Sequence, residues 1–264
     1  MKTIRGLAVF VLAAVSLASQ ADVTGKSITY THKDKQYVGY MAFDDTVKNR
    51  RPGILVVHEW WGLNDFIKAK ADELAKLGYV AFAPDMYGDG KVTIDPEEAG
   101  QWYSKIDKSN LYAERAMAGL RVLEENEHVK PGQLAAIGFC FGGTTVLKAA
   151  YAGAPLKGVV SFHGHLPAAS AREAASVTSA MLVLHGAADP HIKPDQVSAF
   201  EEALSKSRTD WQIIVFGNAQ HGFTNPNASK VGMPGLAYDE QAANRSWNYM
   251  RVFLDQLLGT GTSE

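Results

Sequence analysis

The chain contains a single cysteine, Cys140, which lies between Gly138 and Gly142 in the segment Gly-Phe-Cys-Phe-Gly. A nucleophile with this glycine spacing, between a strand and a helix, occupies a sharp turn in which side chains on either glycine would keep the two elements apart. The turn presents the thiol at the helix N-terminus, where the helix dipole favours a thiolate. The spacing therefore predicts a nucleophilic cysteine. The alternative is a buried, inert thiol in a glycine-rich turn.

Two residues further along the chain have the types that activate such a nucleophile. Asp189 and His221 each follow a predicted strand. A histidine beside the thiol accepts its proton, and a carboxylate behind the histidine orients the imidazole. The backbone N–H of Phe141, at the same turn as Cys140, is free to face a developing oxyanion. We therefore expect a Cys-His-Asp triad that carries out acyl transfer.

Strands and helices alternate along the chain, and their order must position these residues. Such alternation predicts an α/β fold with a mostly parallel central sheet, helices on both faces, and functional residues at the carboxyl ends of the strands. The first two strands form an antiparallel hairpin. The predicted strands span residues 27–31, 36–42, 53–58, 79–83, 134–138, 158–162, 181–185 and 211–216. The predicted helices span residues 64–77, 96–106, 110–127, 141–151, 195–205 and 238–258.

The last predicted helix is amphipathic, with one apolar face that we expect to pack on the sheet. The residues assigned to that face are Tyr238, Ala242, Tyr249, Val252, Phe253 and Leu257.

The first 21 residues have the organisation of a cleavable secretory signal peptide. Lys2 and Arg5 form a basic head, an uncharged run follows, and small residues precede the expected cleavage after Ala21. The uncharged run is shorter than the roughly 20 residues that span a bilayer. An uncleaved N-terminal anchor is the alternative. We expect residues 22–264 to form one domain that is periplasmic or secreted and has no membrane attachment once the signal is removed.

Composition narrows the possible partners. The chain has a formal net charge of −2, which gives no support to binding of nucleic acid or anionic membranes. A hydrophobic fraction of 46% and a charged fraction of 20% are ordinary for a globular domain. We expect a monomer whose partner is a small-molecule ester or lactone.

Five segments together resemble the dienelactone hydrolase family of the α/β-hydrolase superfamily. They are Val-His-Glu-Trp-Trp-Gly-Leu-Asn at 57–64, Ala-Pro-Asp-Met-Tyr at 83–87, Gly-Phe-Cys-Phe-Gly-Gly at 138–143, His-Gly-x-x-Asp at 185–189 and His-Gly-Phe at 221–223. The resemblance covers essentially the whole mature chain. It implies an α/β-hydrolase fold without a large cap domain, the Cys-His-Asp triad, hydrolysis of a lactone or an ester, and neither a metal nor an organic cofactor.

The resemblance also implies roles for residues outside the triad. Glu59 corresponds to the glutamate that contacts the thiol in this family and helps to deprotonate it when substrate arrives. A carboxylate beside a cysteine opposes thiolate formation until it is drawn away. A solvated acid at a strand end is the alternative for Glu59. The backbone N–H of Trp61 is the expected second oxyanion donor. The expected substrate-binding residues are Tyr87, Trp60, Phe223 and Asn225.

Two positions depart from the family pattern. Family members that act on a carboxylated lactone hold its carboxylate with two arginines, and this chain has Asp89 and Asn225 at those positions. An aspartate cannot stabilise a carboxylate, and an asparagine supplies hydrogen bonds without charge. The chemistry of the family therefore transfers to this chain, and the identity of the substrate stays open.

Two other functions remain open from the sequence. One is a non-catalytic small-molecule-binding protein on a hydrolase scaffold, which the missing arginines suggest. The other is a redox-active thiol protein, although the chain has no second cysteine to resolve a mixed disulfide. His163 and His165, a spacing that resembles a metal pair, are expected at the rim of the pocket because no third ligand is evident.

Overall fold

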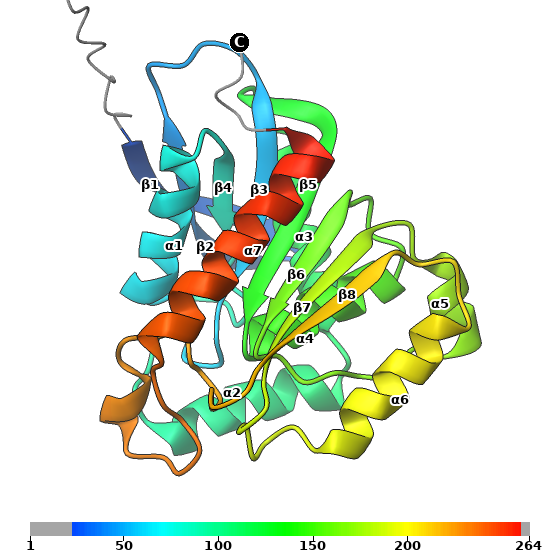
Figure 1. Cartoon of the computed structure of the whole chain (residues 1–264). Coiled ribbons are helices and arrows are strands. Elements are labelled where there is room, and N and C mark those ends of the chain that lie inside the picture. Colours follow the sequence, from blue (N-terminus) through cyan, green and yellow to red (C-terminus); the bar gives the residue numbers. More distant parts are fainter. Residues whose placement is uncertain (1–22, 260–264) are drawn as a thin grey trace, which may run out of the picture.

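Eight strands form one sheet in the computed structural model, which describes residues 23–259 (Figure 1). The signal peptide predicted at residues 1–21 lies outside the described residues. The strand order is β1-β2-β4-β3-β5-β6-β7-β8. The β1–β2 hairpin and the β2–β4 pair are antiparallel, and the remaining neighbours are parallel. The strands are β1 (Val23–His32), β2 (Lys35–Asp44), β3 (Arg51–Val57), β4 (Val80–Ala83), β5 (Val129–Phe139), β6 (Gly158–Phe162), β7 (Ala180–Gly186) and β8 (Trp211–Phe216).

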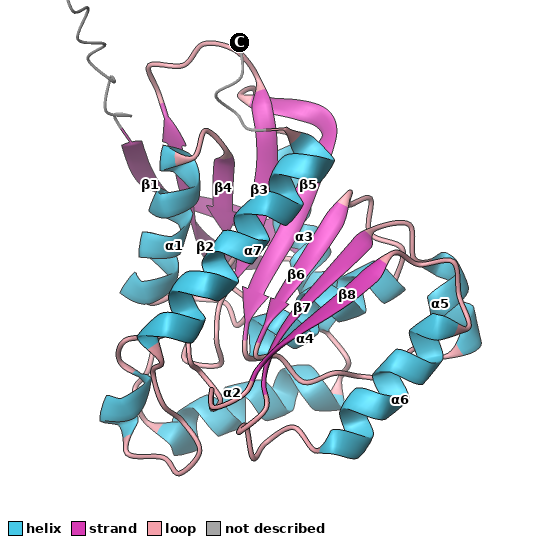
Figure 2. Cartoon of the chain, viewed as in Figure 1, coloured by secondary structure: helices cyan, strands magenta, loops and turns pink. Residues whose placement is uncertain are grey.

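Helices cover both faces of this sheet (Figure 2). Helices α1 and α7 pack on one face, and α3, α4 and α6 pack on the other. The helices are α1 (Asp65–Lys76), α2 (Pro96–Lys108), α3 (Tyr112–Glu124), α4 (Phe141–Tyr151), α5 (Ala171–Ser176), α6 (Pro194–Ser205) and α7 (Glu240–Leu258), with a short 3₁₀ helix η1 (Ala228–Val231). None of the helices within residues 23–259 is long and apolar enough to cross a membrane.

The central strands contain apolar runs because both faces of the sheet are buried there. In β3, Ile54 and Val56 join the cluster under α1 and α7, whereas Leu55 and Val57 join the cluster under α3 and α4. All four side chains are buried. Successive side chains of a strand point to opposite faces, so a strand covered on both sides needs an unbroken apolar run.

Most of the predicted elements agree closely with the structure. The strands at 158–162 and 211–216 and the helix at 141–151 have the predicted bounds. Asn64 caps α1 as expected, because its side chain accepts a hydrogen bond from the Ile67 amide at 3.3 Å. Neither α5 nor η1 was predicted from the sequence.

The predicted apolar face of α7 is partly wrong. Tyr249 and Val252 are 47% and 58% exposed, whereas Met250 and Leu254 are fully buried. Neighbouring residues on a helix are turned by about 100°, so Tyr249 and Val252 point away from the face that holds Met250 and Phe253. A pattern with apolar residues on two adjacent sides of a helix does not by itself show which side meets the sheet.

Candidate active site

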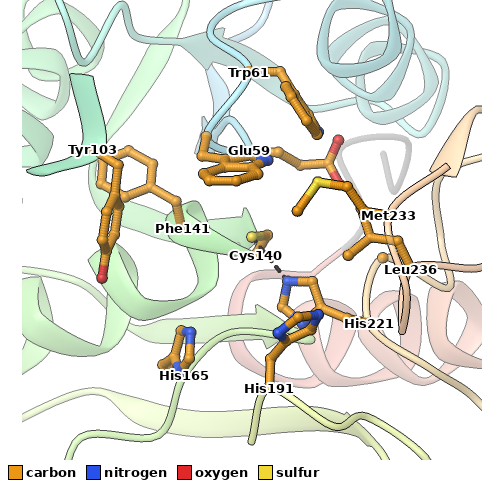
Figure 3. A pocket seen from close by; sticks show the side chains of 12 residues that line it. Glu59, Trp61, Tyr103, Cys140, Phe141, His165, His191, His221, Met233 and Leu236 are labelled. Carbon is orange, nitrogen blue, oxygen red and sulfur yellow. Dashed lines mark hydrogen bonds between the residues drawn. The ribbon is translucent and has the colours of Figure 1, made fainter. Parts of the chain in front are cut away.

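Four of the residues selected from the sequence lie on loops that follow parallel strands. Cys140 follows β5, Asp189 follows β7, His221 follows β8 and Glu59 follows β3. The carboxyl ends of these strands lie at one edge of the sheet, so residues far apart in the sequence meet there (Figure 3). The sheet topology thus brings the predicted triad together.

Cys140 occupies a strained turn between β5 and α4. Its φ of 53° lies in the left-handed region, which non-glycine residues rarely adopt. A Cβ on Gly138 would overlap the carbonyl oxygen of Gly142, and a Cβ on Gly142 would overlap the carbonyl oxygen of Val57. Only glycine fits at both positions. The thiol is partly exposed, which argues against an inert buried cysteine.

In the predicted triad, the side chain of His221 lies within hydrogen-bonding distance of both Cys140 and Asp189. Nε2 of His221 lies 2.9 Å from Sγ of Cys140. Nδ1 of His221 lies 2.7 Å from Oδ2 of Asp189. The other carboxylate oxygen of Asp189 accepts a hydrogen bond from the backbone N–H of His191 at 2.8 Å. Because Asp189 accepts the proton on Nδ1, Nε2 is left to exchange a proton with the thiol.

Charge around His221 favours its protonated form. Burial lowers the pKa of His221, but the neighbouring Cys140 and Asp189 outweigh burial and raise that pKa well above its usual range. Burial raises the pKa of Asp189, but the hydrogen bond and charge of His221 outweigh it and hold that pKa below its ordinary value. A cationic imidazole between two acidic groups stabilises a thiolate on Cys140.

Glu59 lies on the wall of the same cavity but bonds to a different partner from the one expected. Its carboxyl oxygen Oε2 accepts a 2.6 Å hydrogen bond from Nδ2 of Asn225, and the thiol contacts His221 instead. Glu59 is only 3% exposed. Burial raises the pKa of Glu59 to about 7, although the Asn225 hydrogen bond and the charge of His221 oppose the shift. At neutral pH this carboxyl is therefore close to half protonated.

Phe141 and Trp61 line the same cavity as Cys140, and neither backbone amide donates a hydrogen bond to a residue among 23–259. Phe141 is the first residue of α4, where an N–H has no partner within the helix. Trp61 belongs to the loop after β3, which is fixed by a 3.0 Å hydrogen bond from the Thr93 amide to the Trp61 carbonyl. Two free amides on separate rigid loops are suited to an oxyanion.

A cavity of about 160 Å³ opens in front of Cys140 (Figure 3). The cavity is lined by Trp60, Trp61, His165 and His191. His165 lies at the cavity as expected, whereas His163, expected at the rim with it, is only 1% exposed and does not line the cavity. Tyr103 of α2 and, in the segment after His221, Met233 and Leu236 were not selected from the sequence. Their positions depend on how α2 and the loop before α7 pack, and no local motif marks them. The full lining is Glu59, Trp60, Trp61, Tyr103, Cys140, Phe141, His165, His191, His221, Gly222, Met233 and Leu236.

Three of the four predicted substrate-binding residues lie behind the cavity wall. The Tyr87 hydroxyl donates a 3.0 Å hydrogen bond to the carbonyl of Trp60. Phe223 is fully buried and packs edge-on against His163, with ring centroids 5.2 Å apart. Asn225 is buried and bonded to Glu59. These residues support the wall, and Trp60 alone of the four faces the cavity.

His163 connects the turn that holds Cys140 to the loop that holds His221. Its Nδ1 accepts a 3.2 Å hydrogen bond from the backbone N–H of Cys140, and its Nε2 lies 2.8 Å from the Thr224 hydroxyl. Burial and the charge of His221 lower the pKa of His163 well below its usual range, so this ring is neutral. With Nδ1 accepting, Nε2 carries the proton and donates it to Thr224. Within residues 23–259, no group of three His, Cys, Asp or Glu side chains is placed to hold a metal ion.

Comparisons with known proteins agree with this geometry. The model of the dienelactone hydrolase family matches residues 38–258. A provisionally named carboxymethylenebutenolidase from Aquifex aeolicus is 28% identical over 243 residues, which cover 87% of this chain and 99% of that protein. A solved dienelactone hydrolase-like promiscuous phosphotriesterase from metagenomic libraries is 38% identical, with a TM-score of 0.87 over 90% of this chain and 99% of that chain. The chain belongs to the dienelactone hydrolase family and is a hydrolase of esters or lactones.

Proposed function

We propose that the protein is a cysteine hydrolase that cleaves a lactone or an activated carboxylic ester through a triad of Cys140, His221 and Asp189. The observation that carries the proposal is the continuous contact from Sγ of Cys140 through His221 to Asp189, at 2.9 Å and 2.7 Å. A thiolate is an effective nucleophile toward esters whose alcohol departs easily. Enol lactones and aryl esters have such leaving groups.

The proposed reaction proceeds in two acyl transfers. His221 takes the thiol proton, and Sγ of Cys140 attacks the carbonyl carbon to form a carbon–sulfur bond. The Phe141 and Trp61 amides donate hydrogen bonds to the oxyanion that results. The carbon–oxygen bond of the ester then breaks, and His221 returns its proton to the departing oxygen. In the second transfer, His221 removes a proton from water, which attacks the thioester and releases the acid and the thiol.

Glu59 has a separate proposed role in this scheme. An anion beside the sulfur would oppose a thiolate. In this chain the Asn225 amide holds the Glu59 carboxyl and leaves the thiol in contact with His221. We place Glu59 as a group that adjusts thiol reactivity through its own charge, which changes near its pKa of about 7.

The proposal extends to location and assembly. The basic head, short apolar run and small residues before Ala21 support export, so the mature protein is placed in the periplasm or outside the cell. We place it there as a monomer that uses neither metal nor organic cofactor.

Turnover of p-nitrophenyl acetate by the purified mature protein tests the proposal. Cys140→Ala and His221→Ala are each expected to lower kcat by a factor of about 10³ or more. The midpoint urea concentration for unfolding of each variant should lie within about 1 M of the wild-type value. Mass spectrometry of wild type quenched during turnover should show an acetyl group on Cys140. Undiminished turnover in either variant would refute the mechanism, and ligand affinity without an adduct would favour the binding-protein alternative.

A second candidate reaction is hydrolysis of phosphotriesters. It is favoured by the 38% identity to the promiscuous phosphotriesterase, together with a cavity that has no lysine or arginine in its wall. A phosphotriester is uncharged, so it meets no penalty there. The thiolate would displace p-nitrophenolate from diethyl p-nitrophenyl phosphate and form a sulfur–phosphorus bond, which water assisted by His221 then cleaves. Release of one p-nitrophenolate per protein without later turnover would show that only the first step occurs.

A further inference from the structure

Among residues 23–259, the side chains that line the cavity in front of Cys140 include no lysine or arginine, and so none with a permanent positive charge. Aromatic and aliphatic groups form most of the wall: Trp60, Trp61, Tyr103, Phe141, Met233 and Leu236. The ionisable groups are Glu59, the Cys140–His221 pair, His165 and His191. Burial lowers the pKa of His165, so that ring is neutral at neutral pH. A carboxylate entering this cavity would find no fixed cation.

The nearby polar groups that could bind a substrate anion are already engaged elsewhere. Nδ2 of Asn225 is committed to the Glu59 carboxyl at 2.6 Å, and Asn225 lies behind the wall. Nζ of Lys91 lies 3.5 Å from Asp89, and neither residue lines the cavity. The charge on His221 is paired with the Asp189 carboxylate, which lies 2.7 Å from Nδ1. A substrate anion would also be repelled by Glu59 where that carboxyl is ionised.

The size of the cavity limits what fits beside the thiol. Its volume is about 160 Å³. An apolar cavity of about 150 Å³ is large enough to hold one benzene molecule. The wall therefore suits one ring or a short chain, held by contact with aromatic faces on one side and with Met233 and Leu236 on the other (Figure 3).

We infer that the substrates of this protein are uncharged esters or lactones about one ring in size, and that carboxylated analogues are rejected. This inference rests on the proposed function and adds the substrate class to it. The discrimination comes from leaving an anion unpaired in a largely apolar cavity, because such an anion loses its water without gaining a partner.

A size-matched pair of substrates tests the inference. Methyl 4-acetoxybenzoate is neutral, and 4-acetoxybenzoate has a carboxylate at the same position of the same ring. At pH 8, where an ordinary imidazole is neutral, kcat/KM for the neutral ester should exceed that for the carboxylated ester by about 100-fold or more. The para carboxylate cannot reach the acetyl carbonyl, and dividing each kcat/KM by the rate constant of hydroxide hydrolysis removes the difference between the two leaving groups.

A substitution that adds a positive charge to the cavity wall tests the inference in a second way, with an uncharged substitution at the same position as its control. Met233→Lys adds one ammonium group at the edge of the cavity, and the ratio of carboxylated to neutral kcat/KM should rise by about 10-fold or more. Met233→Gln changes polarity at similar length without charge, and its ratio should stay near that of the wild type.

The possible outcomes distinguish failure of this inference from failure of the proposed function. Turnover of both acetoxybenzoates at similar corrected rates by the wild type overturns the inference and leaves the proposed hydrolase standing. A Met233→Lys ratio equal to that of Met233→Gln also overturns it, because charge in the wall would then not control selection. Absence of turnover with every ester, without an adduct on Cys140, would overturn the proposed function and this inference with it.

Discussion

The side-chain amide of Asn225 donates a 2.6 Å hydrogen bond to the carboxyl of Glu59, a residue 166 positions earlier in the chain. This contact joins the loop after β3 to the loop that follows β8. It also occupies a carboxyl that otherwise has the thiol of Cys140 and the imidazole of His221 as its neighbours in the cavity wall. The protonation of Glu59 is consequently linked both to the stability of the protein and to the charge around the sulfur.

Replacement of Glu59 by glutamine should change how stability depends on pH. Burial raises the pKa of Glu59 from 4.5 to about 7. Between these values the unfolded chain has lost the proton and the folded chain retains it, so the free energy of unfolding falls as pH rises through this window and is level above it. The shift corresponds to about 3 kcal/mol at most. Glu59→Gln is neutral throughout and should lack this loss.

Urea unfolding of wild type and Glu59→Gln at pH 4 and pH 8 measures the effect. The variant should gain about 3 kcal/mol relative to wild type between these two pH values. His221 also titrates in both proteins, and because its charge couples to that of Glu59, its contribution is determined separately in each protein. If the free energy of unfolding changed equally with pH in both proteins, the pKa of Glu59 would not be raised by folding.

Replacement of Asp189 by asparagine should impair proton transfer by His221 while leaving the imidazole in place. The Asp189 carboxylate helps to raise the pKa of His221, so the variant should show a lower imidazole pKa and a smaller thiolate fraction. Loss of the orienting carboxylate should lower kcat by about 10³- to 10⁴-fold. The pH profile of Cys140 alkylation by iodoacetamide gives a readout that is independent of turnover. Asp195→Asn, an exposed site on α6, is the matched control and should behave as wild type.

Replacement of Thr224 by valine should destabilise the bridge between the two loops. The Thr224 hydroxyl lies 2.8 Å from Nε2 of the buried His163, and a valine leaves that N–H without a partner. An unsatisfied buried donor costs about 1–3 kcal/mol. Thr224→Ser retains the hydroxyl and should lose less than half as much in urea unfolding. Equal losses in the two variants would mean that the methyl group, and not the hydrogen bond, is what matters.

Replacement of Gly142 by alanine should damage the turn that presents the thiol. The new Cβ would overlap the backbone carbonyl of Val57, which is fixed in the sheet. The expected loss is about 3 kcal/mol or more, in the range of severe core overpacking. Gly217→Ala is the control, because a Cβ there meets nothing within 4 Å, and it should change stability by less than about 0.5 kcal/mol. Wild-type stability of Gly142→Ala would contradict the steric account of the turn.

The order of the strands and the place of the triad follow from local sequence features. Strand β6 has the predicted bounds because all of its residues are buried, which favours a run of small and apolar side chains. Cys140, Asp189 and His221 meet because parallel strands end at the same edge of the sheet. The sheet topology therefore brings together three residues that lie far apart in the sequence.

The residues that form the wall of the cavity are harder to predict from the sequence. Tyr103 reaches the cavity from α2, and Met233 and Leu236 reach it from the segment between η1 and α7. These positions depend on tertiary packing and carry no periodicity or motif. Asn225 was assigned to substrate, whereas its amide bonds to Glu59 through a contact that no local pattern encodes. Phe223 was assigned similarly and is part of the core.

The single cysteine has a practical and a biological consequence. Since the chain has one thiol in total and that thiol is partly exposed beside His221, each equivalent that reacts with a thiol reagent corresponds to one molecule of protein. A titration with such a reagent would count competent molecules in any preparation without a known substrate. The same arithmetic applies to damage, because oxidation of this one accessible sulfur would remove the proposed nucleophile of the molecule.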